Sequence, residues 1–584
     1  MHGKLLVVSD CYLDLMSGSL RITTLGFHAG RRPGDPGLEI KPGTVLIFVG
    51  PNNSGKSLAL REIESWCVGQ DTDRKVVRLI ELDFPDSVLS AGPLLKEFEA
   101  SPPPGQIPTT GKLWVGQHTF RLVEPTRHQQ IDEAQFNAYV TQRNLPYLRA
   151  VLGALYTVRL DGRTRFSLAD PKPTGDLQLH PQNHLWALFV DDDARVGVRN
   201  LTNEAFSLNF VIDPTGMNSF RIRMSTRPPS TKAEEQALDK TARDFHHQAV
   251  AINDLSDGVQ AFVGLVSAIL SLPHKVILID EPEAFLHPPL ARRLGSNLAR
   301  ISGERNASLV VSTHSAEFLM GCIEAVPDTA VVRLTYEAAT PTARALSAAQ
   351  ITELTRDPLL RSTGVLSALF HRAAVVTESD ADRAFYAEVN RRLDTVGRGI
   401  GNALFLNAQN KQTVRRLVGP LRSIGIPAAA LVDLDFLEDS GATWDHMLRE
   451  CQVPGPEKAF ADGERAYLAS VFAGLPGPSG KDRLIKKRGI SALGTADQAR
   501  ASQLLQLLRQ YGLFLVPGGE LEVWLPQLSI PSTLHGPDWL IEVFERIGQV
   551  STDSNYLHAS TGGVWEFIDS IATWVNNQSR AGTD

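Results

Sequence analysis

The chain has 584 residues, of which 43% are hydrophobic and 21% are charged. These are ordinary globular values that exclude wholesale disorder, and at roughly 150 residues per domain the length predicts about three to four domains. The formal net charge is −7, which excludes a uniformly basic coat for nucleic acid but leaves room for a local basic channel.

No apolar run approaches the roughly 18 to 20 residues that cross a bilayer. The apolar N-terminus is broken by Ser9 and Asp10, unlike a signal peptide. The four cysteines lie far apart and form no CxxC pair, which argues against a disulfide scaffold and a structural zinc site. We therefore expect a cytoplasmic protein without a membrane partner.

Short apolar runs rich in Val and Ile alternate with helical patterns, which predicts an α/β fold. A first set of runs predicts buried strands at TVLIFVG (44–50), KVILID (275–280) and SLVVSTH (308–314). A second set predicts strands at AAVVTE (373–378), NALFLN (402–407) and PAAALVDLD (427–435). Helices are expected over Asp380–Leu393 and Thr413–Ile424, and proline-rich surface loops over 101–111 and 226–235.

The long gap between the two strand sets places a domain boundary near residue 365. We predict a first domain over 1–365 with an insertion at about 85–250, a second domain over 366–535 and a helical extension over 536–584. In the extension, the helical spacing of Trp539, Trp565 and Trp574 indicates packing against the core of the second domain, with a partner interface as the alternative.

The residues Gly50 to Ser57, GPNNSGKS, fit the pattern GxxxxGK[ST] between a predicted strand and a helical pattern. In such a loop, backbone N–H groups and the helix N-terminus hold phosphate oxygens, the lysine reaches the β- and γ-phosphates, and the last hydroxyl binds Mg²⁺. A glycine-rich turn without a ligand is the alternative. We expect ATP to be bound by Gly50, Asn52, Asn53, Ser54, Gly55, Lys56 and Ser57.

The run VILIDEPEAFLHP (276–288) supplies the second part of this site. Asp280 ends a strand, where it can hold Mg²⁺ through water, and Glu281 can polarise the attacking water. A carboxylate pair could merely cap the next helix, but the P-loop upstream favours the catalytic interpretation. His314 ends another strand, in VVSTHS, where its imidazole could contact the γ-phosphate or fill a structural role.

These motifs resemble the ATP-binding-cassette (ABC) ATPases of the RecF, SMC and OLD type. The segment NDLSDGVQAFVGL (253–265) resembles their signature motif, with Ser256 and Gly258 at the phosphate-contacting positions and Asp257 where a glycine is usual. In that family the signature of one subunit closes over the ATP of another, so the resemblance implies self-association of ATPase heads. The segment 160–165 either contacts nucleotide or a neighbouring subunit, or forms a turn, which its composition favours.

Acidic residues follow the second set of strands. Glu378 follows AAVVT, and Asp382 lies one helical turn further on the same face. Asp433 and Asp435 form a DxD motif, whose side chains would point the same way in an extended segment. Such residues often cap helices. With Glu520 and Glu522 after a third apolar run, however, the convergence of charge predicts a divalent-cation site.

The motifs ESDADRAFY, VDLDF and GELEVWL resemble the Toprim domain of OLD-family nucleases, which follows a cassette ATPase in that family and in the Gabija nuclease subunit of bacterial anti-phage defence. The resemblance implies an ABC-type P-loop ATPase head over 1–365 and a Toprim nuclease domain with a parallel sheet over 366–535. It implies DNA cleavage with Mg²⁺ or Mn²⁺ by two metal ions. The implied metal ligands are Glu378, Asp382, Asp433, Asp435 and Glu520, with Glu522 secondary; Glu378, Asp433 and Asp435 are the implied catalytic residues.

The sequence departs from that family in two places. Ser379 stands where a glycine commonly follows the first Toprim glutamate, and no lysine occurs after Lys487 although the family's catalytic lysine follows the last acidic motif. Arg546, or a lysine from an earlier loop (Lys481, Lys486 or Lys487), would have to supply its charge, although arginine and lysine are not interchangeable. The triplet KKR (486–488) touches a phosphate backbone or forms a solvated patch, the interpretation that we favour.

The sequence therefore predicts an ATP-binding and ATP-hydrolysing, metal-dependent DNA endonuclease of the OLD type in prokaryotic anti-phage defence, with the ATP state controlling the Toprim site. The expected partners are DNA, further copies of the chain in a dimer or tetramer, and a second defence-system protein. The alternative keeps the ATPase and assigns a Toprim-like domain that binds DNA or holds a partner effector without cleaving. The missing lysine favours this alternative, and the intact carboxylates favour cleavage.

Overall fold

The structure is a computed structural model that describes residues 19–583 except 104, 119–125, 163, 165, 357–363 and 477–482. The chain forms two compact units, Met1–Val49 with Asn53–Ala348, and Gly50–Asn52 with Ala349–Asp584. Within the described residues, no helix combines the length and the hydrophobicity that crossing a membrane requires.

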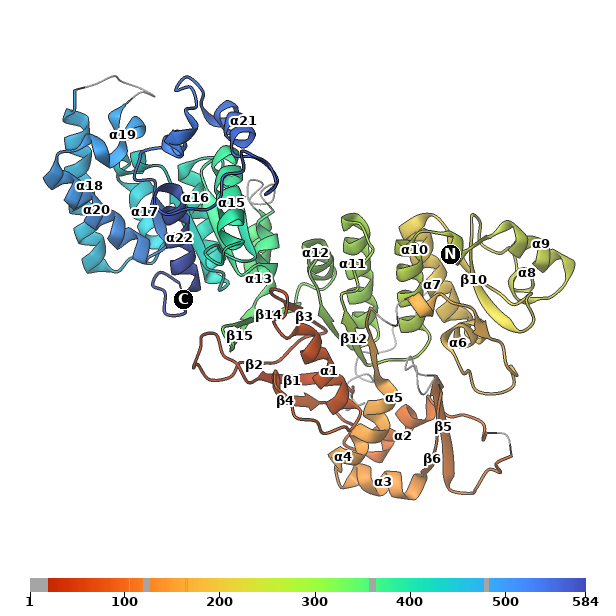
Figure 1. The fold of residues 1–584 in the computed structure, drawn as a ribbon. Coiled ribbons are helices and arrows are strands. Elements are labelled where there is room, and N and C mark those ends of the chain that lie inside the picture. The colour runs from red at the N-terminus through yellow and green to blue at the C-terminus, as the bar shows by residue number, and fades with distance from the viewer. Residues whose placement is uncertain are drawn as a thin grey trace, which may run out of the picture. The chain divides into compact units, whose positions relative to one another are not determined.

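The first unit is organised around a six-stranded sheet in the order β15-β14-β3-β13-β12-β7 (Figure 1). Its neighbouring strands are parallel except β15, which pairs antiparallel with β14. The strands are β3 (Val45–Val49), β7 (Thr157–Leu160), β12 (Val276–Asp280), β13 (Ser308–Ser312), β14 (Ala330–Glu337) and β15 (Thr340–Leu346). The three strands predicted in this unit are confirmed as the neighbours β3, β13 and β12.

Helix α1 (Lys56–Cys67) packs between this sheet and a smaller antiparallel sheet. Its residues Ala59, Leu60 and Ile63 are fully buried and share one hydrophobic cluster with both sheets. The smaller sheet has the order β2-β1-β4 and consists of β1 (Ile22–Phe27), β2 (Glu39–Ile40) and β4 (Val77–Leu82). Because α1 is fixed on two sides, its N-terminus is held in place at the end of the predicted phosphate-binding loop.

The region predicted as one insertion, about 85–250, forms two excursions, because β7 inside it belongs to the main sheet and pairs with β12. The first contains α2 (Val88–Lys96), β5 (Lys112–His118), β6 (Thr126–Asp132), α3 (Glu133–Thr141), α4 (Leu145–Leu148) and α5 (Ala154–Tyr156). The second contains β8 (Lys172–Pro173), α6 (His184–Val190), α7 (Asp192–Phe206), β9 (Asn209–Asp213), β10 (Ser219–Ser225), α8 (Lys232–Gln236), α9 (Lys240–Gln248) and β11 (Val250–Ala251).

The loop predicted over 226–235 is partly wrong. Helix α8 begins inside it, with Thr231 as its N-cap. Glu235 on that helix is buried and pairs with Arg195 at 3.1 Å and Arg199 at 2.6 Å. Proline content alone could not reveal this buried ion pair. The first unit also contains the helices α10 (Asp257–Leu270), α11 (Pro288–Glu304) and α12 (Ala316–Ala325).

The second unit contains a four-stranded parallel sheet in the order β17-β16-β18-β19. The strands are β16 (Ala373–Thr377), β17 (Ala403–Asn407), β18 (Ala428–Val432) and β19 (Leu513–Leu515). The predicted strands at 373–378 and 402–407 are confirmed. The third ends at Val432 and is followed by a 3-10 helix over Leu434–Glu438. Asp435 therefore lies in a helical turn, and the alternation that we expected of an extended DxD segment is wrong.

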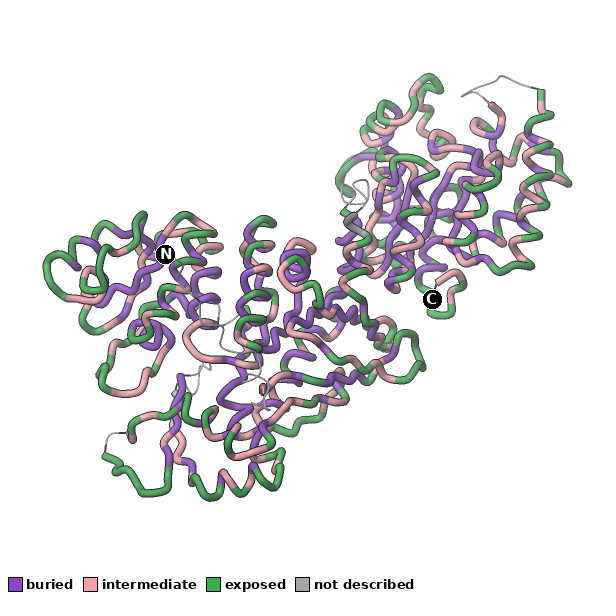
Figure 2. The backbone as a smooth tube through the Cα atoms, turned by 180° about the vertical axis from the view of Figure 1, so that it is seen from behind, coloured by how far each residue is buried: buried purple, intermediate pink, exposed green. Residues whose placement is uncertain are grey.

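Helices cover both faces of this sheet. The predicted helices correspond to α15 (Asp380–Asp394) and α16 (Lys411–Ser423). Helix α15 shares a hydrophobic cluster with alternate strand residues such as Val375 and Leu431, whereas α16 packs against β16 and β18 outside this cluster. Figure 2 shows buried residues gathered in the interior of this unit and exposed residues on its outside. The other helices are α13 (Ala348–Arg356), α17 (Ala442–Glu450), α18 (Gly455–Gly474), α19 (Leu484–Lys487), α20 (Thr495–Gln510), α21 (Gly536–Arg546) and α22 (Gly563–Asn576).

The C-terminal helices α21 and α22 pack against the sheet of the second unit. Trp539, Trp565 and Trp574 are buried in the same cluster as α15 and the strands, as the helical spacing predicts. Trp574 Nε1 also donates to the carbonyl of Gln510 at 3.1 Å. These tryptophans are therefore core residues of the second unit.

Candidate functional site

The carboxyl ends of β3, β12 and β13 bring the predicted nucleotide residues together. The loop from Gly50 to Gly55 joins β3 to α1, and Asn53 and Gly55 adopt φ angles of 61° and 93° in it. Ser57 Oγ donates to Asp280 Oδ1 at 3.0 Å, and Ser312 Oγ donates to the same carboxylate oxygen. The two predicted Mg²⁺ residues are thus in direct contact across two elements. In the loop, Asn52 and Asn53 are exposed, whereas Gly50 and Ser54 are buried.

Lys56 is the buried cation of this group. Its Nζ lies 3.4 Å from Ser54 Oγ. Burial lowers the pKa of Lys56 to about 8, although the charges of Glu281, Asp280 and Glu283 act in the opposite direction. A desolvated ammonium at the start of a helix is suited to phosphate oxygens, because both the charge and the helix N-terminus attract anions.

Glu281 and His314 face each other across neighbouring strands. His314 Nε2 lies 3.6 Å from Glu281 Oε1, and the backbone N–H of His314 donates to Glu283 Oε1 at 2.7 Å. Burial lowers the pKa of His314 to about 4, and the charge of Lys56 acts in the same direction. The imidazole is therefore neutral near pH 7 and can donate or accept a hydrogen bond. The half-exposed Glu281 carboxylate is accessible to water.

The predicted signature residues belong to another element, the N-terminus of α10. Ser256 is the exposed N-cap of this helix. A Cβ on Gly258 would lie 2.8 Å from the carbonyl oxygen of Phe285, so a glycine permits the close approach of α10 to the loop after Asp280. The structure thus brings the predicted signature segment against the loop that follows Asp280.

Within the segment 160–165, the described residues Gly162 and Thr164 lie in a turn, as the composition favours. Asp161 Oδ1 accepts from the N–H of Thr164 at 3.2 Å, and Arg159 donates to Asp161 Oδ2 at 2.8 Å. Arg163 and Arg165 lie outside the described residues. Because β7 neighbours β12, this turn lies at the same sheet edge as Asp280.

In the second unit, four carboxylates lie together beyond the ends of β16 and β18. Glu378 Oε1 accepts from the backbone N–H of Asp433 at 2.9 Å. Ser379 is the N-cap of α15, and its Oγ donates to Asp382 Oδ2 at 2.7 Å. Asp382 and Asp435 are buried. Ser379 therefore has a defined role in positioning Asp382, which accounts for a serine at a place where the resembled family commonly has glycine.

Burial and mutual repulsion change the acidity of these carboxylates. Burial raises the pKa of Glu378 and of Asp433, and the neighbouring negative charges raise both further. Burial also raises the pKa of Asp382 to about 6, and the negative charges of Glu522 and Glu520 act in the same direction. Buried carboxylates that repel one another are costly unless cations neutralise them. This set of oxygen donors fits a divalent cation such as Mg²⁺.

Lysines from two segments approach the same carboxylates. Lys486 Nζ lies 3.2 Å from Asp435 Oδ2 and 3.6 Å from Glu520 Oε2, and Lys487 Nζ lies 3.2 Å from Glu520 Oε1. Lys411 Nζ lies 3.3 Å from Asp435 Oδ1. The side chains of Lys486 and Lys487 are only 21% and 27% exposed, so the solvated patch that we favoured for these two residues is wrong.

The other candidates for the missing cation differ from these lysines. Arg546 pairs with Glu542 on its own helix and donates to the carbonyl of Ser529 at 3.1 Å, so its guanidinium is already engaged there. Lys481 lies outside the described residues. Lys411 was missed by the sequence reasoning, although it begins the helix after the predicted strand 402–407 and therefore lies at the carboxylate edge of the sheet.

Glu520 is the N-cap of a short 3-10 helix over Leu521–Val523, and Glu522 lies within that helix. Glu522 Oε1 accepts from the backbone N–H of Gly536 at 2.8 Å. His535, which the sequence reasoning also missed, places its Nδ1 3.6 Å from Glu522 Oε1. All six predicted acidic residues thus belong to one region of the second unit, linked by hydrogen bonds, shared lysines or their effects on one another's pKa.

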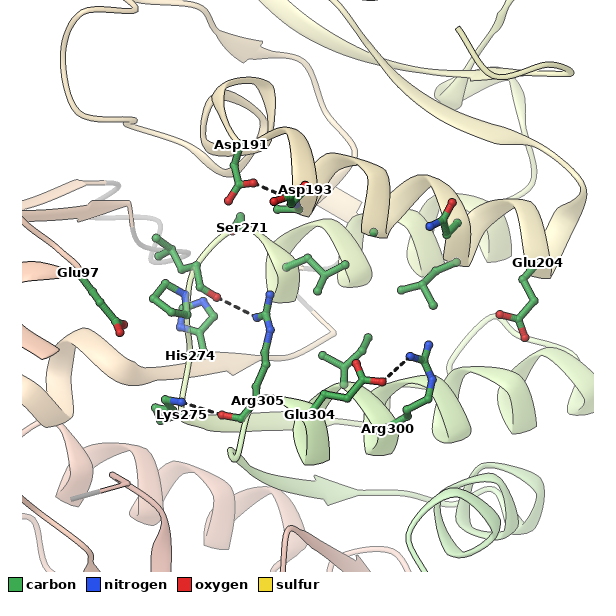
Figure 3. Close-up of a pocket in the computed structure, with 18 residues that line it drawn as sticks. Glu97, Asp191, Asp193, Glu204, Ser271, His274, Lys275, Arg300, Glu304 and Arg305 are labelled. Carbon is green, nitrogen blue, oxygen red and sulfur yellow. Dashed lines mark hydrogen bonds and ion pairs between the residues drawn. The ribbon is translucent and has the colours of Figure 1, made fainter. Parts of the chain in front are cut away.

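A cavity of about 780 Å³ in the first unit lies between α7, α11 and the loop before β12 (Figure 3). Acidic and basic side chains line it together, and the basic ones are engaged locally: Lys275 Nζ donates to the carbonyl of Arg305 at 2.7 Å, and Arg305 donates to the carbonyl of Leu272 at 3.1 Å. None of the predicted nucleotide or metal residues is among the described residues that line this cavity.

Comparison with known proteins identifies one domain. Residues 220–320 match a family model described as "AAA domain, putative AbiEii toxin, Type IV TA system". This range contains Ser256, Asp280, Glu281 and His314 and lies after the P-loop. Together with the contact between Ser57 and Asp280, the match supports a P-loop ATPase-type domain in the first unit. No curated protein matches the chain.

The chain is also similar to solved SMC head domains. The SmcHead bound to the C-winged helix domain of ScpA is 11% identical, with a TM-score of 0.31, and the match covers 56% of this chain and 98% of that chain. The SMC head domain from Thermotoga maritima is 13% identical, with a TM-score of 0.28 over 56% of this chain and 100% of that chain. A Pyrococcus furiosus Smc head domain, bound to the C-terminal domain of ScpA, is 11% identical, with a TM-score of 0.28. The match covers 58% of this chain and 100% of that chain.

Proposed function

We propose that this chain is an ATP-controlled, divalent-metal-dependent DNA endonuclease of the OLD type, acting in the prokaryotic cytoplasm in defence against phage. The observation that carries the proposal is the group of carboxylates at the ends of β16 and β18, in a chain that also has an ATPase-type domain; we assign this group to a Toprim-like site. Convergent buried carboxylates with lysines beside them are suited to binding cations and a phosphodiester.

The residues of the second unit have distinct roles in this proposal. Glu378, Asp382, Asp433 and Asp435 would hold divalent cations, which supply an activated water and stabilise the leaving oxygen when bound. Lys486 would attract the scissile phosphate and replace the lysine that is missing after Lys487. Its ammonium already faces the carboxylates, within 3.2 Å of Asp435.

The first unit would bind ATP with Mg²⁺. Lys56 would contact the β- and γ-phosphates, Ser57 and Asp280 would hold the cation, and Glu281 would orient the attacking water. The neutral His314, 3.6 Å from Glu281, would hold that carboxylate or the γ-phosphate by a hydrogen bond.

Ser256 and Gly258 would complete the nucleotide site of a second copy, so that ATP drives self-association into a dimer or tetramer. ATP would then control cleavage because the associated and separate forms bind nucleotide with different affinity. A second defence-system protein would be an additional partner.

A second candidate function is an ATPase sensor or scaffold whose Toprim-like domain binds DNA or a partner effector without cleaving. One observation favours it: Asp435 already has Lys411, Lys486 and Arg483 within 3.7 Å. Basic side chains of the protein itself can therefore neutralise this carboxylate without a metal ion.

Cleavage of supercoiled and linear DNA by the full chain tests the proposal. Reactions contain Mg²⁺ or Mn²⁺, with and without ATP, and compare the wild type with the double variant Asp433→Asn/Asp435→Asn. Asp462→Asn is the matched control, because Asp462 pairs with Lys458 elsewhere in the second unit. Metal-dependent cleavage that only the double variant loses supports the nuclease. Absence of cleavage under all nucleotide conditions, while ATP hydrolysis persists, refutes it in favour of the scaffold.

A further inference from the structure

Three metal-binding side chains of two kinds converge in the second unit. Glu520, Glu522 and His535 each offer one ligand atom, and these atoms lie within 4.8 Å of one another. Glu520 is the N-cap of one 3-10 turn and Glu522 lies within it, and the histidine directly precedes α21. Residues from separate segments thus present two carboxylates and one imidazole to the same point.

Backbone contacts hold both segments in position. The N–H of Gly536 donates to Glu522 Oε1 at 2.8 Å and so fixes the start of α21 beside this glutamate. Gly519 has a φ of 118°, and a Cβ there would lie 2.0 Å from the carbonyl oxygen of Lys486. Only glycine allows this close packing, which fixes the direction of Glu520. The arrangement is therefore a built feature of the fold and not a chance meeting of flexible surface chains.

The group is accessible and lies beside the other carboxylates. The side chains of Glu520, Glu522 and His535 are 13%, 16% and 40% exposed, so a cation can enter past the imidazole. Lys486 Nζ lies between Glu520 at 3.6 Å and Asp435 at 3.2 Å. This ammonium lies between Asp435, which belongs to the all-oxygen group around Glu378, and Glu520, which belongs to the group that contains His535.

The donor set indicates which cation fits. Mg²⁺ prefers oxygen ligands, whereas imidazole nitrogen is a ligand of first-row transition metals, among which Mn²⁺ also suits carboxylate oxygens. We propose that Glu520, Glu522 and His535 form a separate metal site that binds Mn²⁺ in preference to Mg²⁺, beside the all-oxygen group. Binding at this site requires no nuclease activity; only its use in cleavage rests on the proposed function.

Electron spin-echo spectroscopy of Mn²⁺ added to the chelator-treated full chain tests the proposal, without DNA or nucleotide. Nitrogen coupling from a histidine ligand is expected in the wild type and is lost in His535→Gln. Calorimetry is expected to show Mn²⁺ affinity at this site weakened by at least about tenfold in the same variant. Mg²⁺ affinity of the all-oxygen group should be unchanged, because that group does not use His535.

Two histidine variants control for other nitrogen ligands. His314→Gln tests the nucleotide site, and His558→Gln removes an exposed histidine of the same unit; both are expected to retain the coupling. Glu522→Gln should weaken Mn²⁺ binding as His535→Gln does, which guards against a folding defect in one variant. A wild type without nitrogen coupling, or coupling that survives in His535→Gln, overturns the site. Neither result depends on cleavage, so failure of the nuclease proposal is seen separately.

Discussion

Replacing Asp382 by asparagine tests whether the ionised carboxylates of the acidic group destabilise the fold when no cation is bound. Burial raises the pKa of this carboxyl from 3.8 to about 6. Between pH 3.8 and about 6, the carboxyl is therefore protonated in the folded form and ionised in the unfolded form. The free energy of unfolding falls as the pH rises through this range and does not change further above it. At pH 7.5 the rise in pKa corresponds to about 3 kcal/mol of lost stability, and at pH 4.5 to about 1 kcal/mol.

Asp382→Asn removes this charge and keeps an oxygen that can accept from Ser379 Oγ, which donates at 2.7 Å in the wild type. We expect the variant to unfold at higher urea concentration, with a gain near 3 kcal/mol at pH 7.5 and about 1 kcal/mol at pH 4.5. Tryptophan fluorescence of the chelator-treated full chain reports on the second unit, which contains Trp444, Trp524, Trp539, Trp565 and Trp574 of the eight tryptophans.

Asp380→Asn is the matched control for Asp382→Asn, because Asp380 lies exposed in the same helical turn and pairs with Arg383 at 3.0 Å. The difference in unfolding free energy between Asp380→Asn and the wild type should not increase with pH. Saturating Mg²⁺ should cancel or reverse the gain in unfolding free energy of Asp382→Asn, since a bound cation makes the wild-type carboxylate stabilising. A variant that is destabilised equally at both pH values would refute the reasoning.

Three other variants or conditions test separate parts of the structure. ATP affinity should fall by about tenfold per pH unit above pH 8, because Lys56 then loses its proton before ATP arrives; calorimetry with a non-hydrolysable analogue showing constant affinity from pH 7 to 9.5 would contradict this. Glu281→Gln should lower phosphate release by about 10²-fold or more while ATP still binds, and unchanged release would remove Glu281 from the catalytic role. Gly519→Ala should destabilise the second unit by about 3 kcal/mol or more, since it adds a strained φ and a clash; Gly494→Ala, with open space around its Cα, should be near neutral, and equal urea midpoints for the two would disprove the packing argument.

The arrangement of the candidate nucleotide site could be predicted largely from the sequence because its motifs are local. A P-loop joins consecutive residues, so the spacing of Lys56 and Ser57 is set by the chain itself. Asp280 and His314 each end a short apolar run, and parallel strands bring such ends to one edge. The contact between Ser57 and Asp280 follows from these two rules.

The second site could be predicted only in part, because its cations come from segments without a motif. Lys411 and His535 are single residues whose neighbours carry no pattern, and their approach to the carboxylates depends on how α16 and α21 pack. The 3-10 turn at Asp435 follows from tertiary packing and not from alternation along a strand. Ser379 was noticed only as a departure, while its capping bond to Asp382 became visible in three dimensions.

Strand β7 has a consequence for shortening the protein. It is the edge strand of the main sheet, and its four residues, Thr157–Leu160, cover β12, which carries Asp280. Deleting 85–250 as one block would expose the backbone N–H and C=O groups of β12 beside the candidate nucleotide site. Such an unpaired edge strand promotes aggregation. A shorter form of the first unit should instead be obtained by shortening the two excursions independently and keeping strand β7, which lies between them in the chain.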